Sequence, residues 1–183
     1  MIAEHHEKIF SDFEGTIIDI ETIGDFDNSF GNDSRRYRNI VQVILGYIDR
    51  NQLHIYYAKS TDAITELKII TPKIIADRSK PLYAFNSEFE ACVFFHHIGL
   101  EITFGGELNS AKFEKKKDVV RSLKIPNYDD PFFDDGFKCM LAWQRNQYDQ
   151  AIAHNRACLL KERDILLKRH FRKPDKLTLV NER

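Results

Sequence analysis

Two carboxylates, Asp19 and Glu21, are two residues apart in the apolar run Gly-Thr-Ile-Ile-Asp-Ile-Glu-Thr at residues 15–22. The β-branched residues of this run predict a buried strand, in which alternate side chains point to the same face, so the two acids share one face. Burying two adjacent carboxylates costs free energy unless a cation neutralises them, and Mg²⁺ or Mn²⁺, which prefer oxygen ligands, would do so. The alternative interpretation is a strand end where both acids face water.

A second pair of polar residues follows the apolar segment 81–85, which predicts another buried strand. Asn86 comes first, and Glu90 stands four residues later, where an apolar stretch predicts a helix over residues 87–97. An acid in the first turn of a helix is stabilised by the helix dipole alone. The position of Glu90 also suits a metal site shared with Asp19.

A third group of polar residues lies within residues 149–170, where apolar side chains at heptad spacing predict a long helix. The group begins with His154 and Asn155, and Cys158 follows. Glu162 is one helical turn beyond Cys158, on the same surface of the helix. It is therefore placed either to reach a metal ion or to pair with a nearby lysine or arginine.

In this order, the three groups resemble the motifs of the DEDD 3′–5′ exonuclease superfamily. The resemblance is to its ribonuclease H-like predicted exonuclease branch, which is related to the exonuclease domain of family B DNA polymerases. The first family motif is Asp-x-Glu, the second is commonly Asn-x-x-Phe-Asp, and the third has Tyr or His, then Asn, then Asp four residues after the Tyr or His. Glu90 stands at the acid of the second motif and Cys158 at the acid of the third. The resemblance covers roughly residues 16–167, and only the three short motifs are specific.

The resemblance implies two-metal hydrolysis of phosphodiesters with Mg²⁺ or Mn²⁺. The implied metal ligands are Asp19, Glu21 and Glu90, with Glu162 as a substitute for the missing fourth acid. Because a neutral thiol is a poor ligand for a hard cation, Cys158 would weaken the second metal site. The alternative function is a catalytically impaired domain that binds nucleic acid or a protein, and a chance match in an unrelated α/β protein is a third alternative.

The resemblance also implies roles for other residues near the metal ligands. His154 would position or deprotonate the attacking water, although a helical histidine satisfied by a neighbour is the simpler interpretation. Asn86 would orient Glu90 or contact substrate, and Asn155 is a further substrate-binding candidate. The expected substrate is the single-stranded 3′ end of DNA or RNA.

A basic stretch supplies candidate phosphate contacts, which we assign to Lys115, Lys116 and Lys117. The chain as a whole has 27 basic and 28 acidic residues, so only a local patch can attract a polyanion. A solvated helix face is the alternative interpretation of the stretch. The remaining cysteines, Cys92 and Cys139, are in apolar helical context and are expected to be packing residues.

The pattern of elements predicts an α/β domain over residues 1–171, with a ribonuclease H-like mixed sheet of about five strands, the first three antiparallel, flanked by helices. Besides the strands already named, further strands are predicted at residues 40–48, 53–58 and 100–104. Further helices are predicted at residues 61–75, 112–124 and 137–144, and Pro72 is expected to break or end the first of these. A charged tail at residues 172–183 is expected to be loosely held.

The cysteine count and the hydropathy pattern bear on the cellular setting. Three cysteines far apart in the sequence predict neither a disulfide framework nor a zinc site. No apolar run approaches the roughly 18 residues of a membrane span, and the first residues lack the features of a signal peptide. We therefore expect a cytoplasmic protein with no membrane partner.

Overall fold

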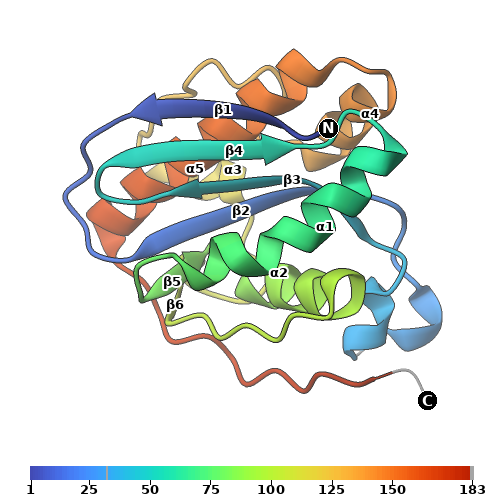
Figure 1. The fold of residues 1–183 in the computed structure, drawn as a ribbon. Helices are drawn as coiled ribbons and strands as arrows, with labels where there is room; N and C mark the ends of the chain where they lie inside the picture. The colour runs from blue at the N-terminus through green and yellow to red at the C-terminus, as the bar shows by residue number, and fades with distance from the viewer. Residues whose placement is uncertain (32, 182–183) are drawn as a thin grey trace.

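The computed structural model describes residues 1–31 and 33–181. Residue 32, in the segment expected to be a loop, and the last two residues of the expected tail lie outside the described residues. Within the described part the chain is an α/β fold with an open six-stranded mixed sheet, flanked by five α-helices. The strands lie in the order β1-β4-β3-β2-β5-β6 (Figure 1).

The centre of the sheet is strand β2 (Thr16–Ile23). It pairs antiparallel with β3 (Val41–Ile48), and β3 pairs antiparallel with β4 (Gln52–Tyr57). On its other side β2 is parallel to β5 (Leu82–Ala84), which is parallel to the short β6 (Gly106–Glu107). The predicted mixed sheet is therefore confirmed, and its first three predicted strands, which are β2, β3 and β4, are antiparallel. The sheet has six strands where about five were predicted.

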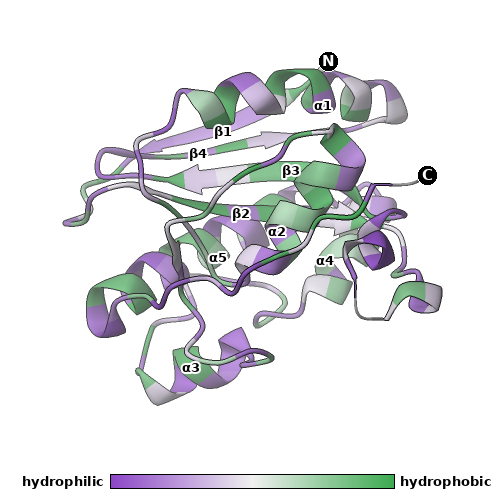
Figure 2. Cartoon of the chain, turned by 90° about the horizontal axis from the view of Figure 1, so that it is seen from below, coloured by the Kyte–Doolittle hydropathy of each residue, from purple (hydrophilic) through white to green (hydrophobic). Residues whose placement is uncertain are grey.

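Helices cover both faces of the sheet. Helices α1 (Thr61–Ala76) and α2 (Ser87–Val93) lie on the face toward the viewer in Figure 1. Helices α4 (Gly136–Gln144) and α5 (Tyr148–Arg169) cover the other face, with α3 (Lys116–Ser122) beside α5. Figure 2 shows apolar residues along β2 and β3 and many polar residues on α3 and α5. No helix in residues 1–31 and 33–181 is long and apolar enough to cross a bilayer.

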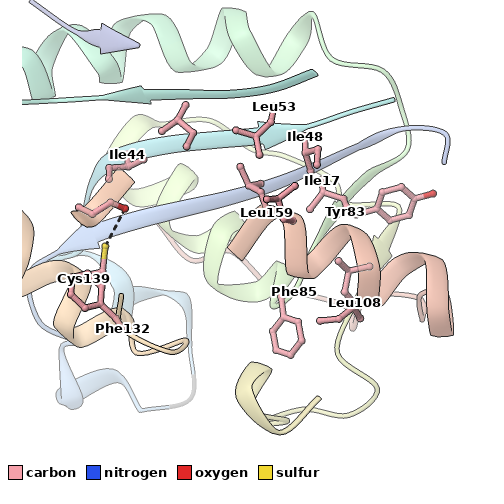
Figure 3. Packing of buried hydrophobic residues seen from close by; sticks show 14 of the residues in the cluster. Ile17, Ile44, Ile48, Leu53, Tyr83, Phe85, Leu108, Phe132, Cys139 and Leu159 are labelled. Atoms are coloured by element: carbon pink, nitrogen blue, oxygen red, sulfur yellow. Dashed lines mark hydrogen bonds between the residues drawn. The ribbon is translucent and has the colours of Figure 1, made fainter. Parts of the chain in front are cut away.

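The alternation of side chains along β2 separates two hydrophobic clusters. Ile17 belongs to the cluster that α5 covers, and Leu159 of α5 reaches the strands beside it (Figure 3). Ile18 and Ile20 belong to the cluster that α1 and α2 cover. By the same alternation Asp19 and Glu21 share the face of Ile17, as the sequence predicted, and so both point toward α5.

Strand β1 (Ala3–Lys8) was not predicted. It pairs antiparallel with β4 at the edge of the sheet, over the register from Ala3 opposite Tyr57 to Lys8 opposite Gln52. Its sequence, Ala-Glu-His-His-Glu-Lys, is polar because an edge strand exposes much of its surface. A polar segment of this kind carries no hydrophobic pattern from which a strand could be predicted.

Several predicted elements differ from the structure. The strand predicted at residues 100–104 is wrong, and β6 instead pairs with β5 immediately after it. Pro72 does not break α1, which continues to Ala76 and buries Ile75 in the core. The helix predicted from residue 112 begins only at Lys116.

The segment after α5 is held against the body of the protein, contrary to the expectation of a loosely held tail. Arg172 exchanges two backbone hydrogen bonds with Glu107 at the edge strand β6. Farther along, the backbone N–H of Val180 donates to the Ser34 hydroxyl, and Leu179 packs against the core. The Arg172 side chain adds an ion pair with Glu107 and hydrogen bonds to Asn109, so the charged residues of this segment hold it in place.

Candidate metal centre

Asn155 of α5 holds the carboxylate of Asp19 on β2. Its side-chain amide donates to Asp19 Oδ2 over 2.7 Å, and Asn155 is fully buried. The contact is possible because Gly46 stands opposite Asp19 on β3. A Cβ atom at Gly46 would lie 2.1 Å from Asn155 Oδ1 and 2.9 Å from Leu159 Cδ1, so α5 can approach the sheet this closely only at a glycine.

His154 lies beside Asn155 on α5 and is held by a carboxylate that the sequence had not singled out. Its Nδ1 donates to Asp130 Oδ1 over 2.7 Å, while Nε2 lies 3.7 Å from both Glu21 Oε1 and Cys158 Sγ. The His154 ring is therefore fixed, with Nε2 directed at the side chains of Glu21 and Cys158. A carboxylate that orients a histidine in this way is common around metal and catalytic sites.

A buried ion-pair network supports Asp130. Its other oxygen accepts from Lys161 Nζ over 2.7 Å, and Lys161 also donates to Asp134 Oδ1 over 2.8 Å. Lys161 is fully buried, so both of its contacts are in a region of low dielectric constant. The sequence gives two signals of this network. Lys161 falls on the core-facing side of the predicted long helix, and the loop at residues 129–135 is rich in aspartates.

Burial and charge act in opposite directions on the ionisable groups here. Burial raises the pKa of Glu21 to about 7, although His154 opposes the shift. For His154, burial would lower the pKa, but contacts with Cys158, Glu21 and Asp130 outweigh burial and raise it. Burial also raises the pKa of the Cys158 thiol. The raised pKa of His154 favours a proton on Nε2, which faces Glu21 and Cys158.

Lys116, the first residue of α3, projects its ammonium group into the same cluster. Its Nζ lies 3.1 Å from Asp19 Oδ1 and 2.5 Å from Glu162 Oε1, and its side chain is only 17% exposed. Burial alone would lower the pKa of this lysine, but the negative charges around it raise the pKa well above its ordinary value. Lys116 therefore stays charged among the carboxylates.

Glu90 of α2 and Glu162 of α5 complete what we call the carboxylate cluster, which is defined by Asp19, Glu21, Glu90 and Glu162. Both glutamates are buried. Burial, then repulsion from Asp19 and Glu162, raises the pKa of Glu90 well above its ordinary value. Within the described residues, Glu90 Oε2 and both carboxylate oxygens of Glu162 lack a hydrogen bond of good geometry, despite the ion pair of Glu162 with Lys116.

The carboxylates of this cluster suit a divalent cation as ligands. Buried oxygen acceptors without donors are costly, and a cation that prefers oxygen satisfies several of them at once. Ligand atoms of Asp19, Glu21 and Cys158 lie within 4.8 Å of one another, as do those of Glu21, Cys139 and His154. The carboxylates suit Mg²⁺ or Mn²⁺, while the added sulfur and imidazole nitrogen favour softer ions than Mg²⁺.

The carboxylate cluster opens into a pocket of about 450 Å³, whose walls include Asp19, Glu21, Glu90, His154 and Cys158. Exposed Asn86 also lines this pocket, whereas Asn155 is buried behind Asp19. Of the substrate-binding candidates, Asn86 is therefore placed where it can meet a ligand. Asn155 is placed to orient a carboxylate.

A larger groove of about 800 Å³ adjoins the pocket, and the two share Lys116, Asp134 and Gly136 in their walls. Lys115 and Lys117 are exposed on this groove, so they are available for phosphates, unlike Lys116. Phe133, 69% exposed, lines the groove, and Phe137, 64% exposed, lines the pocket. Both rings are therefore accessible to a ligand bound in the pocket or the groove.

The chain matches no family model, no curated protein and no solved structure at a significant level. Its chemistry is therefore inferred from its own residues. Of the sequence-predicted residues, the structure brings Asp19, Glu21, Glu90, Glu162, His154 and Cys158 to one place. The sequence did not single out Asp130 and Lys161. Asp130 accepts hydrogen bonds from both His154 and Lys161 and so fixes the His154 ring.

Proposed function

We propose that this protein is a metal-dependent 3′–5′ exonuclease of ribonuclease H-like fold, acting on single-stranded nucleic acid. The observation that carries the proposal is the convergence of four buried carboxylates from β2, α2 and α5 beside one pocket. Such a concentration of acids is costly without a divalent cation. The strand order around β2, and the directions of its neighbours, support the ribonuclease H-like part of the proposal.

Asp19 and Glu21 would hold the metal ion, because their ligand atoms and that of Cys158 lie within 4.8 Å of one another, and Glu90 lines the same pocket. A divalent ion bound there would supply positive charge to a phosphate and acidity to a water molecule. His154, fixed by Asp130, would donate from Nε2 and so position a phosphate oxygen or the water. In the reaction, water adds to phosphorus and the P–O3′ bond breaks, giving a mononucleotide 5′-phosphate and a new 3′-hydroxyl group.

The groove supports nucleic acid as the substrate class. Lys115, Lys117 and Arg121 offer positive charge for phosphates, and Phe133 and Phe137 offer rings for stacking bases. This combination of cations and exposed aromatic rings is typical of surfaces that bind single strands without sequence preference. The 3′-to-5′ direction comes from the family resemblance alone.

The alternative function, a nuclease-like domain that binds without cleaving, is favoured by a specific observation. Lys116 already offsets part of the negative charge of Asp19 and Glu162, and Cys158 offers a weak ligand where the resemblance implies an acid. Under this alternative the protein binds oligonucleotides but leaves them intact.

Digestion of a 5′-labelled single strand by the purified protein, in Mn²⁺ and in Mg²⁺, tests the proposal. We expect progressive shortening from the 3′ end that EDTA stops and that Asp19→Asn abolishes. The control is Asp118→Asn, which changes an exposed carboxylate on α3. A wild-type protein that leaves the strand intact with both metals overturns the exonuclease proposal, and retained binding of the same strand then supports the alternative.

A further inference from the structure

Lys116 occupies a place among the carboxylates that a surface lysine would not take. Its ammonium group contacts Asp19 from β2 and Glu162 from α5 at the same time, so it bridges two elements of the site. The aromatic ring of Phe85 lies 5.6 Å from Nζ on a further side. A divalent cation that bound both carboxylates would occupy the same bridging position.

Contacts to Lys116 divide the carboxylate cluster into two parts. Asp19 and Glu162 share the ammonium group, and Glu162 has no other partner of good geometry in the described part of the chain. Among the described residues, Nζ makes its ion pairs with Asp19 and Glu162 and makes none with Glu21 or Glu90, and Glu90 keeps an unpaired oxygen. The ammonium group therefore offsets part of the negative charge of Asp19 and Glu162, and Glu90 still has an oxygen without a partner.

We propose that Lys116 takes the place of a second divalent cation, so that the centre binds one metal ion and completes its charge with an ammonium group. This inference rests on the proposed function, because it requires a metal ion at Asp19 and Glu21. The sequence predicted that Lys116 binds phosphates along the groove. Under this inference only Lys115 and Lys117 keep that role.

The replacement has a chemical consequence for a bound phosphodiester. A lysine ammonium carries three N–H donors, of which contacts with Asp19 and Glu162 use two. The third is free to donate to a phosphate oxygen or to the leaving oxygen as negative charge develops there. Lys116 thereby supplies charge stabilisation that two-metal enzymes obtain from the second ion.

Counting bound Mn²⁺ by calorimetric titration and by electron paramagnetic resonance tests the inference without measuring activity. We expect one Mn²⁺ per wild-type chain, with the spectrum of an isolated ion. Lys116→Met, which keeps the length and removes the charge, should bind two, with the weakened signal of coupled ions about 4 Å apart. The matched controls are Lys115→Met and Lys117→Met, which change exposed neighbours and should bind one.

Two Mn²⁺ bound to the wild-type protein, or one bound to Lys116→Met, overturns the inference and leaves the proposed function standing. A wild-type protein that binds no Mn²⁺ overturns the proposed function itself. Should Lys116→Met fail to fold in the absence of metal, the wild-type stoichiometry and its spectrum still decide between one ion and two.

Discussion

The imidazole of His154 and the carboxylate of Asp130 are joined by a 2.7 Å hydrogen bond, in which Nδ1 donates to Oδ1. Asp130 is separated from His154 by a loop and by α4, and both side chains are buried. The pKa of Asp130 is lowered despite burial, mainly by His154 and Lys161, so the group is an ionised acceptor. The pair therefore fixes which nitrogen faces the pocket.

Asp130→Asn should weaken this arrangement, because a neutral amide neither holds the ring as firmly nor balances Lys161. We expect Mn²⁺ affinity or nuclease activity to fall by about 10–100-fold, as for other partners that orient a functional histidine. The free energy of unfolding, measured in urea, should fall by on the order of 3 kcal/mol, because the buried Lys161 then has only Asp134 as an ion-pair partner. Asp129→Asn, at the exposed neighbouring position, is the control, and equal behaviour of the two variants would contradict this role.

Gly46→Ala tests the close approach of α5 to β3. The added methyl group would overlap Asn155 Oδ1, so Asn155 must move away from Asp19. We expect a loss of about 1–3 kcal/mol in the free energy of unfolding, typical of overpacking, and weaker Mn²⁺ binding. Gly31→Ala is the matched control because nothing lies within 4 Å of its added Cβ atom. Unchanged Mn²⁺ affinity in Gly46→Ala would show that Asn155 does not orient Asp19 for metal binding.

Cys158→Asp should restore an oxygen ligand at the position where the resemblance implies an acid. Because hard cations prefer carboxylate to thiol, we expect Mg²⁺ to bind at least about tenfold more tightly, which corresponds to about 1.4 kcal/mol. Cys158→Ser is the control, since it changes sulfur to a neutral oxygen at nearly constant size. Equal Mg²⁺ affinities of the Asp and Ser variants, measured by calorimetry, would show that position 158 does not touch the ion.

His97 gives the folded state a dependence on pH away from the metal centre. Its Nδ1 accepts a hydrogen bond from the backbone N–H of Gln42, which requires a neutral ring, and burial, then Lys68, lowers its pKa to about 4. The unfolded chain thus binds a proton that the folded chain does not, and this stability is lost as the pH falls from about 6.5 to 4. His97→Asn, which keeps an acceptor, should remove on the order of 1–2 kcal/mol of that dependence, since water partly screens this half-buried ring.

The measurement is urea unfolding of wild type and His97→Asn at several pH values between 4 and 7. The difference between the two proteins isolates His97 from the other titrating groups. If the free energies of unfolding of the two proteins change with pH in the same way over this range, His97 is not the source of the pH dependence.

Phe133 and Phe137 should each contribute to the binding of single strands. Removing a stacking ring costs about 1–3 kcal/mol per base, so Phe133→Ala and Phe137→Ala should each raise the Kd for an oligonucleotide by roughly 5- to 150-fold. Phe10→Ala is the matched control, because Phe10 is 70% exposed but lies beside Arg50, outside both the pocket and the groove. Fluorescence anisotropy with a labelled strand measures the change, and the same Kd in all three variants would exclude stacking at the site.

Strong local patterns made much of the architecture predictable. The β-branched run of β2, the apolar strand β3 and the heptad pattern of α5 each follow from a hydrophobic period that the chain displays directly. Strand β1 could not be predicted, because it forms mainly through backbone hydrogen bonds of a polar segment. The contacts of residues 172–180 could not be predicted either, because they join this segment to residues far from it in the sequence. Strand β6 is too short for a periodic signal.

By itself the sequence determined that Asp19 and Glu21 share a face, because strand side chains alternate whatever the rest of the fold does. It also determined the one-turn spacing of Cys158 and Glu162, which is a property of any helix. Only the tertiary structure decided that Lys116 enters the carboxylate cluster and that Asp130 holds His154. These contacts join segments 97 and 24 residues apart, and no local period encodes where a loop delivers its charged side chains.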